Sequence, residues 1–212
     1  MATFDWRDFL MQWSRELLAC ADIAAAVGPE VARSGWLGYP PAGGEEIAAA
    51  EARLGARLPP SYRAFLSTTN GWREAGFFIH NLWPVAEIEW YAARHQDLID
   101  AWMAGANYYG PAPPVPDAEY FVYDETQAAL RDEYLQTALE ISEDTGDGVC
   151  LLNPQVVFPD GEWEAWFFAH WIPGAHRYRS FWDLMQAERQ GFLYVRAHNY
   201  TRAGSIYRRK RA

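Results

Sequence analysis

The spacing of the hydrophobic residues changes along the chain, and this change limits the possible folds more than any other feature. Over residues 5–26, 45–54 and 85–103, apolar residues recur at steps of three and four, which is typical of amphipathic helices. Residues 105–117 contain four prolines and therefore predict an irregular connection. After residue 117, short runs rich in aromatic and β-branched residues predict strands. A chain that has helices first and strands second is expected to form an α+β domain.

The predicted strands are short and are separated by turn signals such as Asp160-Gly161. Their short connections favour antiparallel pairing over crossovers. We expect them at residues 77–82, 120–123, 139–142, 149–152 and 163–168. Residues 125–136 are expected to be helical or irregular, and Ser180 is expected to cap a final helix over 181–190.

The composition suits a single globular domain. The chain has 212 residues, of which 50% are hydrophobic and 16% aromatic, so it can bury a core and is not expected to be disordered. No stretch approaches the roughly 20 apolar residues of a membrane span, and the start of the chain lacks the features of a signal peptide. We therefore expect a cytoplasmic protein that contacts no membrane. Cys20 and Cys150 are too few for a disulfide framework or a four-thiolate zinc site, and Cys150 is expected to be buried and unreactive.

The formal net charge of −10 is unevenly distributed. Residues 117–147 contain ten acidic residues and one basic residue, whereas residues 176–212 contain nine basic and two acidic residues. The acidic segment has two interpretations: a solvated surface paired with the chain's own cations, or a docking surface for a basic protein such as a nuclease. In the second interpretation, the candidate partner-binding residues are Asp124, Glu125, Asp132, Glu133, Glu143 and Asp144. A net acidic protein repels phosphates, so we do not expect the basic end of the chain to bind nucleic acid.

Residues with catalytic or metal-binding chemistry form no recognised motif. The five histidines are isolated, and the chain has neither an HExxH sequence nor a glycine-rich phosphate loop. Glu143, Asp144 and Asp147 surround a glycine turn, but their spacing differs from that of a calcium loop, which favours a purely structural turn. Glu162 and Glu164 alternate along a predicted strand, so we expect both on one solvated face of the sheet. We accordingly expect no catalytic residues, no metal and no cofactor.

A proline corner lies between two predicted helices. Leu58-Pro59-Pro60 opens the second of them, because proline suits the first turn of a helix, and Asn70-Gly71 closes it. This pattern and the strings around it resemble the signature of the SMI1/KNR4, or SUKH, superfamily. The matching strings run in order from residue 36 to residue 188: Trp36-Leu37-Gly38, Glu45-Glu46-Ile47, Glu51, Leu54-Gly55, Tyr62, Phe65-Leu66, Trp72, Gly146-Asp147-Gly148, Leu151-Leu152-Asn153-Pro154, Asp160-Gly161-Glu162-Trp163 and Ser180-Phe181.

The resemblance implies an α+β fold with a mainly antiparallel, curved sheet packed by helices, and no known catalytic role. Bacterial members of the superfamily look like immunity proteins that bind and neutralise toxins, often nucleases, delivered by neighbouring cells. Fungal members resemble regulatory scaffolds in cell-wall signalling. Compared with a minimal domain of this kind, we expect an extra N-terminal helical extension over 1–35, the SMI1/KNR4-like domain over 36–190 and a basic tail over 191–212.

Three functions stand as hypotheses. The first is a non-enzymatic immunity protein that binds a basic, nuclease-type toxin and neutralises it by occlusion. The second is an intracellular regulatory or scaffold module with a host protein partner. The third is a metal-dependent hydrolase that uses Glu143, Asp144 or Asp147. We favour the first, in which charge steers the encounter and aromatic side chains hold the complex.

Overall fold

A five-stranded antiparallel sheet, with the strand order β3-β4-β5-β6-β7, forms the centre of the structure. The computed structural model describes residues 4–104, 114–123, 128–144, 146–169 and 171–198. The strands of the sheet are β3 (Glu89–Trp90), β4 (Leu139–Glu140), β5 (Val149–Val157), β6 (Trp163–Phe168) and β7 (Ala175–Tyr178). A separate two-stranded sheet pairs β1 (Trp72–Arg73) with β2 (Asn81–Leu82). The prediction of an α+β fold with antiparallel strands is confirmed.

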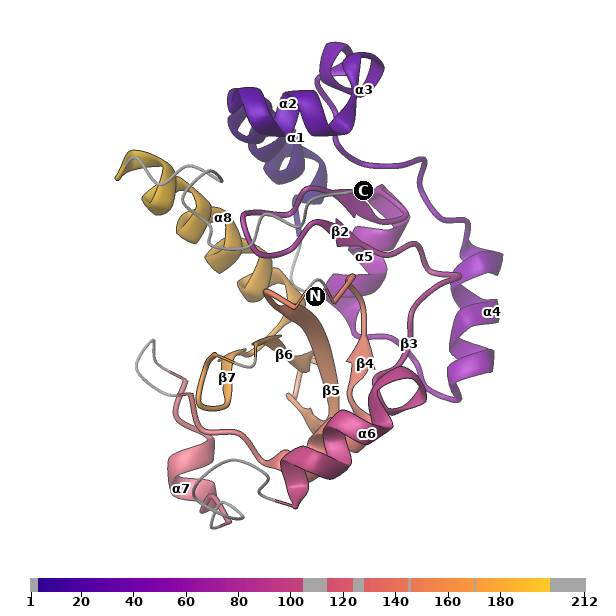
Figure 1. The fold of residues 1–212 in the computed structure, drawn as a ribbon. Helices are drawn as coiled ribbons and strands as arrows, with labels where there is room; N and C mark the ends of the chain where they lie inside the picture. The colour runs from indigo at the N-terminus through magenta and orange to yellow at the C-terminus, as the bar shows by residue number, and fades with distance from the viewer. Residues whose placement is uncertain (1–3, 105–113, 124–127, 145, 170, 199–212) are drawn as a thin grey trace.

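Helices cover both faces of the sheet. In Figure 1, α1 to α3 lie at one end of the molecule and α6 and α7 at the other, with the five-stranded sheet between them. The α-helices are α1 (Trp6–Leu18), α2 (Ala21–Val27), α3 (Pro29–Ser34), α4 (Gly44–Leu54), α5 (Pro60–Thr68), α6 (Ala92–Met103), α7 (Asp117–Tyr120) and α8 (Phe181–Ala197). A 3₁₀ helix, η1 (Asp132–Thr137), precedes β4.

Helix ends follow the local signals in the sequence. Gly55 ends α4 in the left-handed region, with φ of 67°, and α5 begins at Pro60. The hydroxyl of Ser180 accepts a hydrogen bond from the backbone N–H of Asp183, at 3.1 Å, and so caps α8. The predicted helices over 45–54 and after Pro59 are confirmed. The predicted final helix is also confirmed, although α8 extends beyond residue 190 to Ala197.

Three predictions from periodicity and composition were wrong in part. The helix predicted over 5–26 is two helices, because the backbone of Cys20 is extended and turns the chain between α1 and α2. The helix predicted over 85–103 begins only at Ala92, after the short strand β3. Of the strand predicted over 77–82, only Asn81–Leu82 is paired. Aromatic residues are enriched in strands, yet here Phe77 stacks on Phe192 of α8 from a loop.

The second half of the chain also departs from the predictions. No strand covers residues 120–123, since Tyr120 ends α7 and its ring is buried. Strand β5 is longer than the predicted 149–152, and β7 was not predicted, because its four residues show no clear apolar alternation. The strand predicted over 163–168 is confirmed. Residues 105–113 and 124–127 lie outside the described part of the chain, so the expected irregular connection is described only from residue 114.

The sheet separates two hydrophobic cores. Along β6, Ala165 and Phe167 face the larger core with α1, α5 and α8, whereas Trp166 and Phe168 face a smaller core beneath α6 and η1. Trp6 of α1 is 1% exposed, and its ring lies 5.3 Å from that of Phe65 and 5.4 Å from that of Phe181. The N-terminal helix therefore contributes to the larger core rather than standing apart from it. The predicted domain boundaries at 35 and 190 remain predictions.

Glu164 lies in β6 with its carboxylate completely buried. The expectation of a solvated face for Glu162 and Glu164 was wrong. Glu162 instead accepts hydrogen bonds from the backbone N–H and the hydroxyl of Ser61, at 2.7 and 2.6 Å, at the start of α5. The two oxygens of Glu164 accept hydrogen bonds of 2.7–2.9 Å from Arg177, Tyr123, Tyr120, Asn153 and Trp166.

The Glu164 cluster, defined by Glu164 and its five donors, is expected to be the main polar determinant of stability. Glu164→Gln removes the charge that balances buried Arg177 and reduces the number of acceptor sites. We expect the free energy of unfolding to fall by about 3–5 kcal/mol, as when one partner of a buried ion pair is removed. Urea denaturation followed by tryptophan fluorescence measures this change. Glu30→Gln, at an exposed position of α3, is the control; a loss for Glu164→Gln as small as that of an exposed pair, about 1 kcal/mol or less, contradicts the prediction.

Candidate functional site

Four neighbouring rings form a partly exposed cluster on the structure, which we name the aromatic patch: Phe78, Phe167, Trp171 and His176. The centroid of the Trp171 ring lies 5.6 Å from that of Phe78 and 6.1 Å from that of Phe167. Phe78 is 41% exposed and Trp171 51% exposed, although both side chains are large and apolar. Exposed aromatic side chains held in a group are typical of surfaces that bind other proteins.

The patch is positioned by the sheet and by two loops. Phe167 of β6 and His176 of β7 are register partners, and their rings stack with centroids 6.3 Å apart. Phe78 comes from the loop between β1 and β2, and Trp171 from the turn between β6 and β7. Gly148 leaves room for the Phe167 ring, because a Cβ atom there would lie 2.5 Å from it. The four rings therefore come from the sheet and from two loops and contact one another on one surface.

An acidic turn over residues 143–147 adjoins the aromatic patch. The indole N–H of Trp171 donates a hydrogen bond of 2.9 Å to the backbone carbonyl of Asp147. Glu143 accepts a hydrogen bond from the side-chain amide of Asn81, and Asp144 accepts one from the backbone N–H of Gly146, at 3.0 and 2.8 Å. Both carboxylates are exposed. The structural role predicted for this turn agrees with the Asp144 hydrogen bond, which closes it.

The other predicted partner-binding residues lie elsewhere. Asp132 and Glu133 are at the start of η1, which precedes β4, whereas the acidic turn follows β4. Asp132 accepts a hydrogen bond of 2.9 Å from the indole N–H of Trp102, and burial raises the pKa of its carboxyl. Glu133 is exposed. Asp124 and Glu125 lie outside the described residues. Glu143 and Asp144 thus belong to the turn that is hydrogen bonded to Trp171 of the aromatic patch, whereas Asp132 contacts Trp102, which packs against the smaller core.

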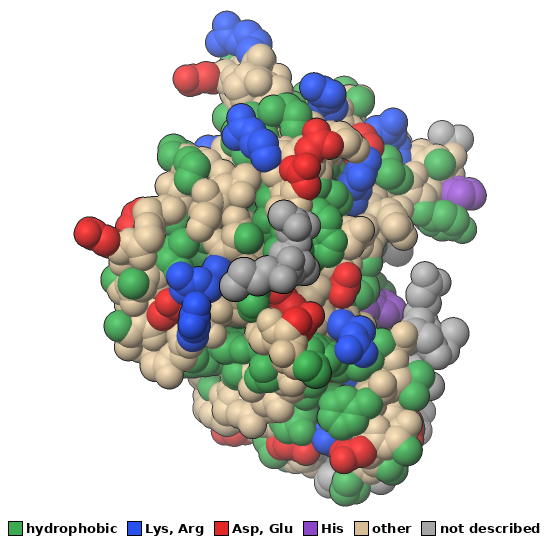
Figure 2. Space-filling view, turned by 180° about the vertical axis from the view of Figure 1, so that it is seen from behind, with side chains coloured by type: hydrophobic (Ala, Val, Ile, Leu, Met, Phe, Trp, Pro, Cys, Tyr) green, Lys and Arg blue, Asp and Glu red, His purple; other side chains and the backbone are tan. Residues whose placement is uncertain are grey.

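Part of the acidic segment is paired within the chain. Asp117 forms an ion pair with Arg131, and the buried carboxylate of Glu140 pairs with Arg94 and His95, each at 3.0 Å. On the face of the molecule that Figure 2 shows, acidic and basic side chains are interspersed among hydrophobic ones rather than gathered in one acidic area. The acidic segment is therefore partly self-paired, and the exposed carboxylates of the acidic turn are among those that remain available to a partner.

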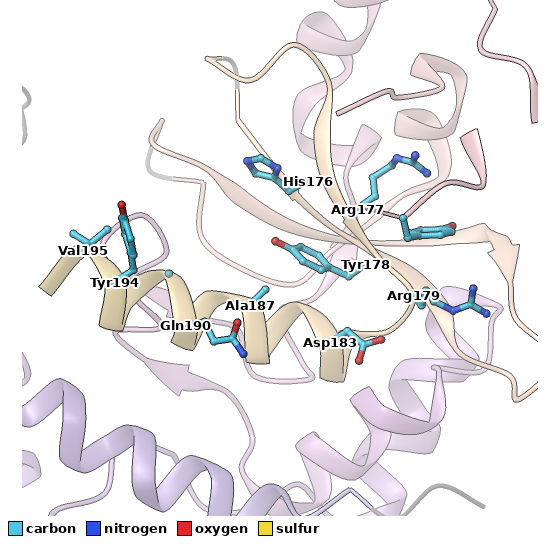
Figure 3. A pocket seen from close by; sticks show the side chains of 11 residues that line it. His176, Arg177, Tyr178, Arg179, Asp183, Ala187, Gln190, Tyr194 and Val195 are labelled. Carbon is cyan, nitrogen blue, oxygen red and sulfur yellow. The ribbon is translucent and has the colours of Figure 1, made fainter. Parts of the chain in front are cut away.

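A groove runs between β7 and α8 beside the aromatic patch (Figure 3). It holds a pocket of about 700 Å³, in which Tyr178 of the strand and Arg179, which follows the strand, lie opposite Asp183 of the helix. Two small residues of α8, Ala187 and Gly191, line the pocket and leave space beneath the strand. Because side chains alternate along β7, His176 and Tyr178 face α8, whereas Arg177 reaches the Glu164 cluster on the other face of the sheet.

A second pocket of about 190 Å³, which we name the Glu188 pocket, adjoins the groove. Four phenylalanine rings line it: Phe77, Phe78, Phe167 and Phe192. Glu188 of α8 also lines it, and burial among these rings raises the pKa of its carboxyl to about 7. Burial lowers the pKa of His176, which therefore favours its neutral form at neutral pH. Within the described residues, no side chain or backbone group forms a hydrogen bond or ion pair with the Glu188 carboxylate.

Three further features bear on function: metal-binding clusters, the thiol of Cys150 and membrane-spanning helices. The described residues contain no group of three or more His, Cys, Asp or Glu side chains that could hold a metal ion. Cys150 is 1% exposed, as predicted, and burial raises the pKa of its thiol. No helix within the described ranges is long and apolar enough to cross a membrane.

Sequence reasoning missed Phe78, Trp171 and Glu188. Phe78 was assigned to a strand from its composition, and Trp171 lies in a turn where no periodicity could place it. Glu188 looks like an ordinary polar residue of an amphipathic helix. The signals that could have drawn notice to this surface were a tryptophan inside the turn-rich string Trp171-Ile172-Pro173-Gly174 and the small residues Ala187 and Gly191 on one face of α8.

Comparison with known proteins identifies one family. The family model described as the SMI1 / KNR4 family (SUKH-1) matches residues 41–187, a span that begins just before α4 and ends within α8. The matched span is more than half of the chain. It includes the five-stranded sheet, the acidic turn and all four residues of the aromatic patch. A search of curated proteins found no match to the chain.

The raised pKa of Glu188 makes stability depend on pH. The folded state holds this proton up to about pH 7, whereas an unfolded chain releases it near the ordinary glutamate value of 4.5. The stabilising contribution of the proton is thus complete below pH 4.5 and is lost as the pH rises through 7. We expect Glu188→Gln to be more stable than the parent chain by about 1–2 kcal/mol at pH 8, with solvent access through the pocket limiting the gain.

Urea denaturation of both chains between pH 5 and pH 8 tests this expectation. The difference between their free energies of unfolding should be small at pH 5, grow through pH 7 and then level off. Glu30→Gln, with the same loss of charge at an exposed site of α3, should show no such growth. A pH-independent difference for Glu188→Gln contradicts the prediction.

Proposed function

Because the chain belongs to the SMI1/KNR4 family (SUKH-1), we propose that it is a non-enzymatic immunity protein that binds a toxin in the cytoplasm and neutralises it by occlusion. Membership of the family supports an immunity-type or related protein-binding domain. The toxin, its nuclease character and its basic charge are our extension of that assignment. In this proposal the aromatic patch and the acidic turn together form the surface that meets the toxin.

One observation carries the proposal: two exposed aromatic side chains stand beside exposed carboxylates. Trp171, half exposed, is hydrogen bonded to the acidic turn and contacts Phe78. Aromatic anchors supply most of the affinity of protein interfaces, while charges around them accelerate the encounter. A nuclease has a basic cleft because it must attract phosphates, so an acidic rim around an aromatic centre is complementary to it.

The direct test uses toxin domains encoded beside the gene for this chain. Each is purified and mixed with the chain, and binding and toxin activity are measured together. We expect one such domain to bind in a defined stoichiometry and to lose its activity. Failure of every neighbouring toxin domain to bind contradicts the proposal, and tight binding to a host protein instead favours the regulatory or scaffold alternative.

Aromatic truncation should weaken the complex strongly. We expect Phe78→Ala and Trp171→Ala each to raise the Kd by about 30-fold or more, the loss typical of a central aromatic anchor. Isothermal titration calorimetry with the toxin domain measures the change, and circular dichroism checks the fold. Phe121→Ala is the matched control, because Phe121 is 47% exposed but lies at the end of α7, away from the patch. Equal effects at all three positions contradict the proposed surface.

Charge neutralisation should act on the rate of association. For the double variant Glu143→Gln, Asp144→Asn, we expect slower association and a weaker dependence of that rate on salt, with little change in dissociation. Asparagine keeps the oxygen that closes the turn. The comparison variant Asp132→Asn, Glu133→Gln should slow association less, because these residues lie before β4 rather than in the acidic turn. Stopped-flow mixing at several salt concentrations measures both, and an unchanged rate for the first variant removes the acidic turn from the interface.

A further inference from the structure

The Glu188 pocket has the size of a site for one side chain. Its volume of about 190 Å³ is smaller than the roughly 300–1,000 Å³ of ordinary ligand and cofactor pockets. Its walls are ordered by ring contacts: Phe77 stacks on Phe192 at 5.1 Å, and Phe78 lies 6.2 Å from Phe167. A single long side chain with an apolar stem therefore suits the pocket better than a nucleotide or a helix does.

Within the described residues, no cation pairs with the Glu188 carboxylate when it is ionised. The loop at Gly76 passes close to the Glu188 carboxylate, since a Cβ atom on Gly76 would lie 3.7 Å from Oε2. The arginine next to Glu188 in the sequence, Arg189, is already paired with Glu16, at 2.6 and 2.7 Å. Arg179 lies over the ring of Phe158, 4.4 Å from its centroid. A carboxylate placed among rings with no partner is unfavourable by itself, and a cation that enters the pocket removes this cost.

We propose that the Glu188 pocket receives an arginine side chain of the protein partner. A guanidinium pairs with a carboxylate through two parallel hydrogen bonds, stacks on aromatic rings and is more weakly hydrated than the ammonium of lysine. All three properties suit a pocket in which phenylalanine rings surround a carboxylate. The proposal rests on the proposed function, because it states how the partner of that same surface is held.

The position of the pocket makes such an arginine a central contact. Phe78 and Phe167 belong both to the aromatic patch and to the wall of the Glu188 pocket. An arginine that enters the pocket passes the exposed ring of Phe78 and ends at the half-buried carboxylate of Glu188. Interface arginines contribute most to affinity where the partner's surrounding contacts exclude water from the ion pair, and the aromatic patch would supply such contacts here.

The test uses two short peptides and the full chain. Acetyl-Gly-Arg-Gly-amide is compared with the same peptide containing citrulline, a neutral analogue of arginine with nearly the same shape. Binding is followed by NMR, through the indole N–H of Trp171 and the carboxyl carbon of Glu188. We expect the arginine peptide to bind with a Kd on the order of 1 mM, to move both signals and to lower the pH at which Glu188 titrates, and the citrulline peptide to have no effect.

Glu188→Gln keeps the shape of the side chain and should raise the Kd of the arginine peptide at least about tenfold, while Glu30→Gln should leave it unchanged. Equal binding of the two peptides, no binding of either, or full binding to Glu188→Gln overturns the proposal. The chain's own basic end is an alternative occupant. If the arginine peptide binds only after Arg208, Arg209, Lys210 and Arg211 are all changed to glutamine, that segment fills the pocket, and the assignment to a partner is overturned.

These outcomes are separate from those of the proposed function. A toxin domain that binds Glu188→Gln as tightly as the parent chain overturns the arginine pocket and leaves the immunity function standing. If binding of the arginine peptide depends on Glu188 but no toxin domain binds the chain, the pocket is supported and the immunity function is contradicted.

Discussion

The buried carboxylate of Glu164 is the constraint on which the arrangement of the sheet depends. A carboxylate with no access to water must be charge-balanced and hydrogen bonded, and five side chains from β5, β6, β7 and the segment around α7 meet this requirement. The cluster also ties residues 120–123 to the sheet, although they form no strand. Its geometry therefore determines how the last strand and the α7 segment are oriented.

The orientation of β7 follows from this cluster and leads directly to the candidate site. Arg177 points into the Glu164 cluster, so its neighbours His176 and Tyr178 must point to the opposite face, toward α8. There His176 stacks on Phe167, and the small residues of α8 leave the groove and the Glu188 pocket open. A residue on one face of the sheet thus orients the residues of the candidate site on the other face.

Local signals predicted much of the fold and little of the site. The proline corner before α5, the glycine after α4 and the Ser180 cap act within a few residues, so the sequence alone was sufficient for them. The burial of Glu164 depends on donors up to 44 residues away along the chain, and no spacing rule reveals such a set. Phe78 and Trp171 come together only because two loops meet beside β6 and the acidic turn, and aromatic content alone favoured a strand for Phe78.

The desolvation of the Glu188 carboxylate lowers stability but is consistent with a role in binding. The ionised carboxylate is unfavourable in the free chain, because the four phenylalanine rings around it limit its contact with water. Above pH 7, where this carboxyl is ionised, we expect a glutamine at this position to give a more stable protein. A cation of the partner would offset this desolvation cost when it binds. The pocket would therefore favour a positively charged side chain over a neutral one. The net charge of −10 is therefore a poor guide to the proposed contact, which depends on a single carboxylate that has no ion-pair partner among the described residues.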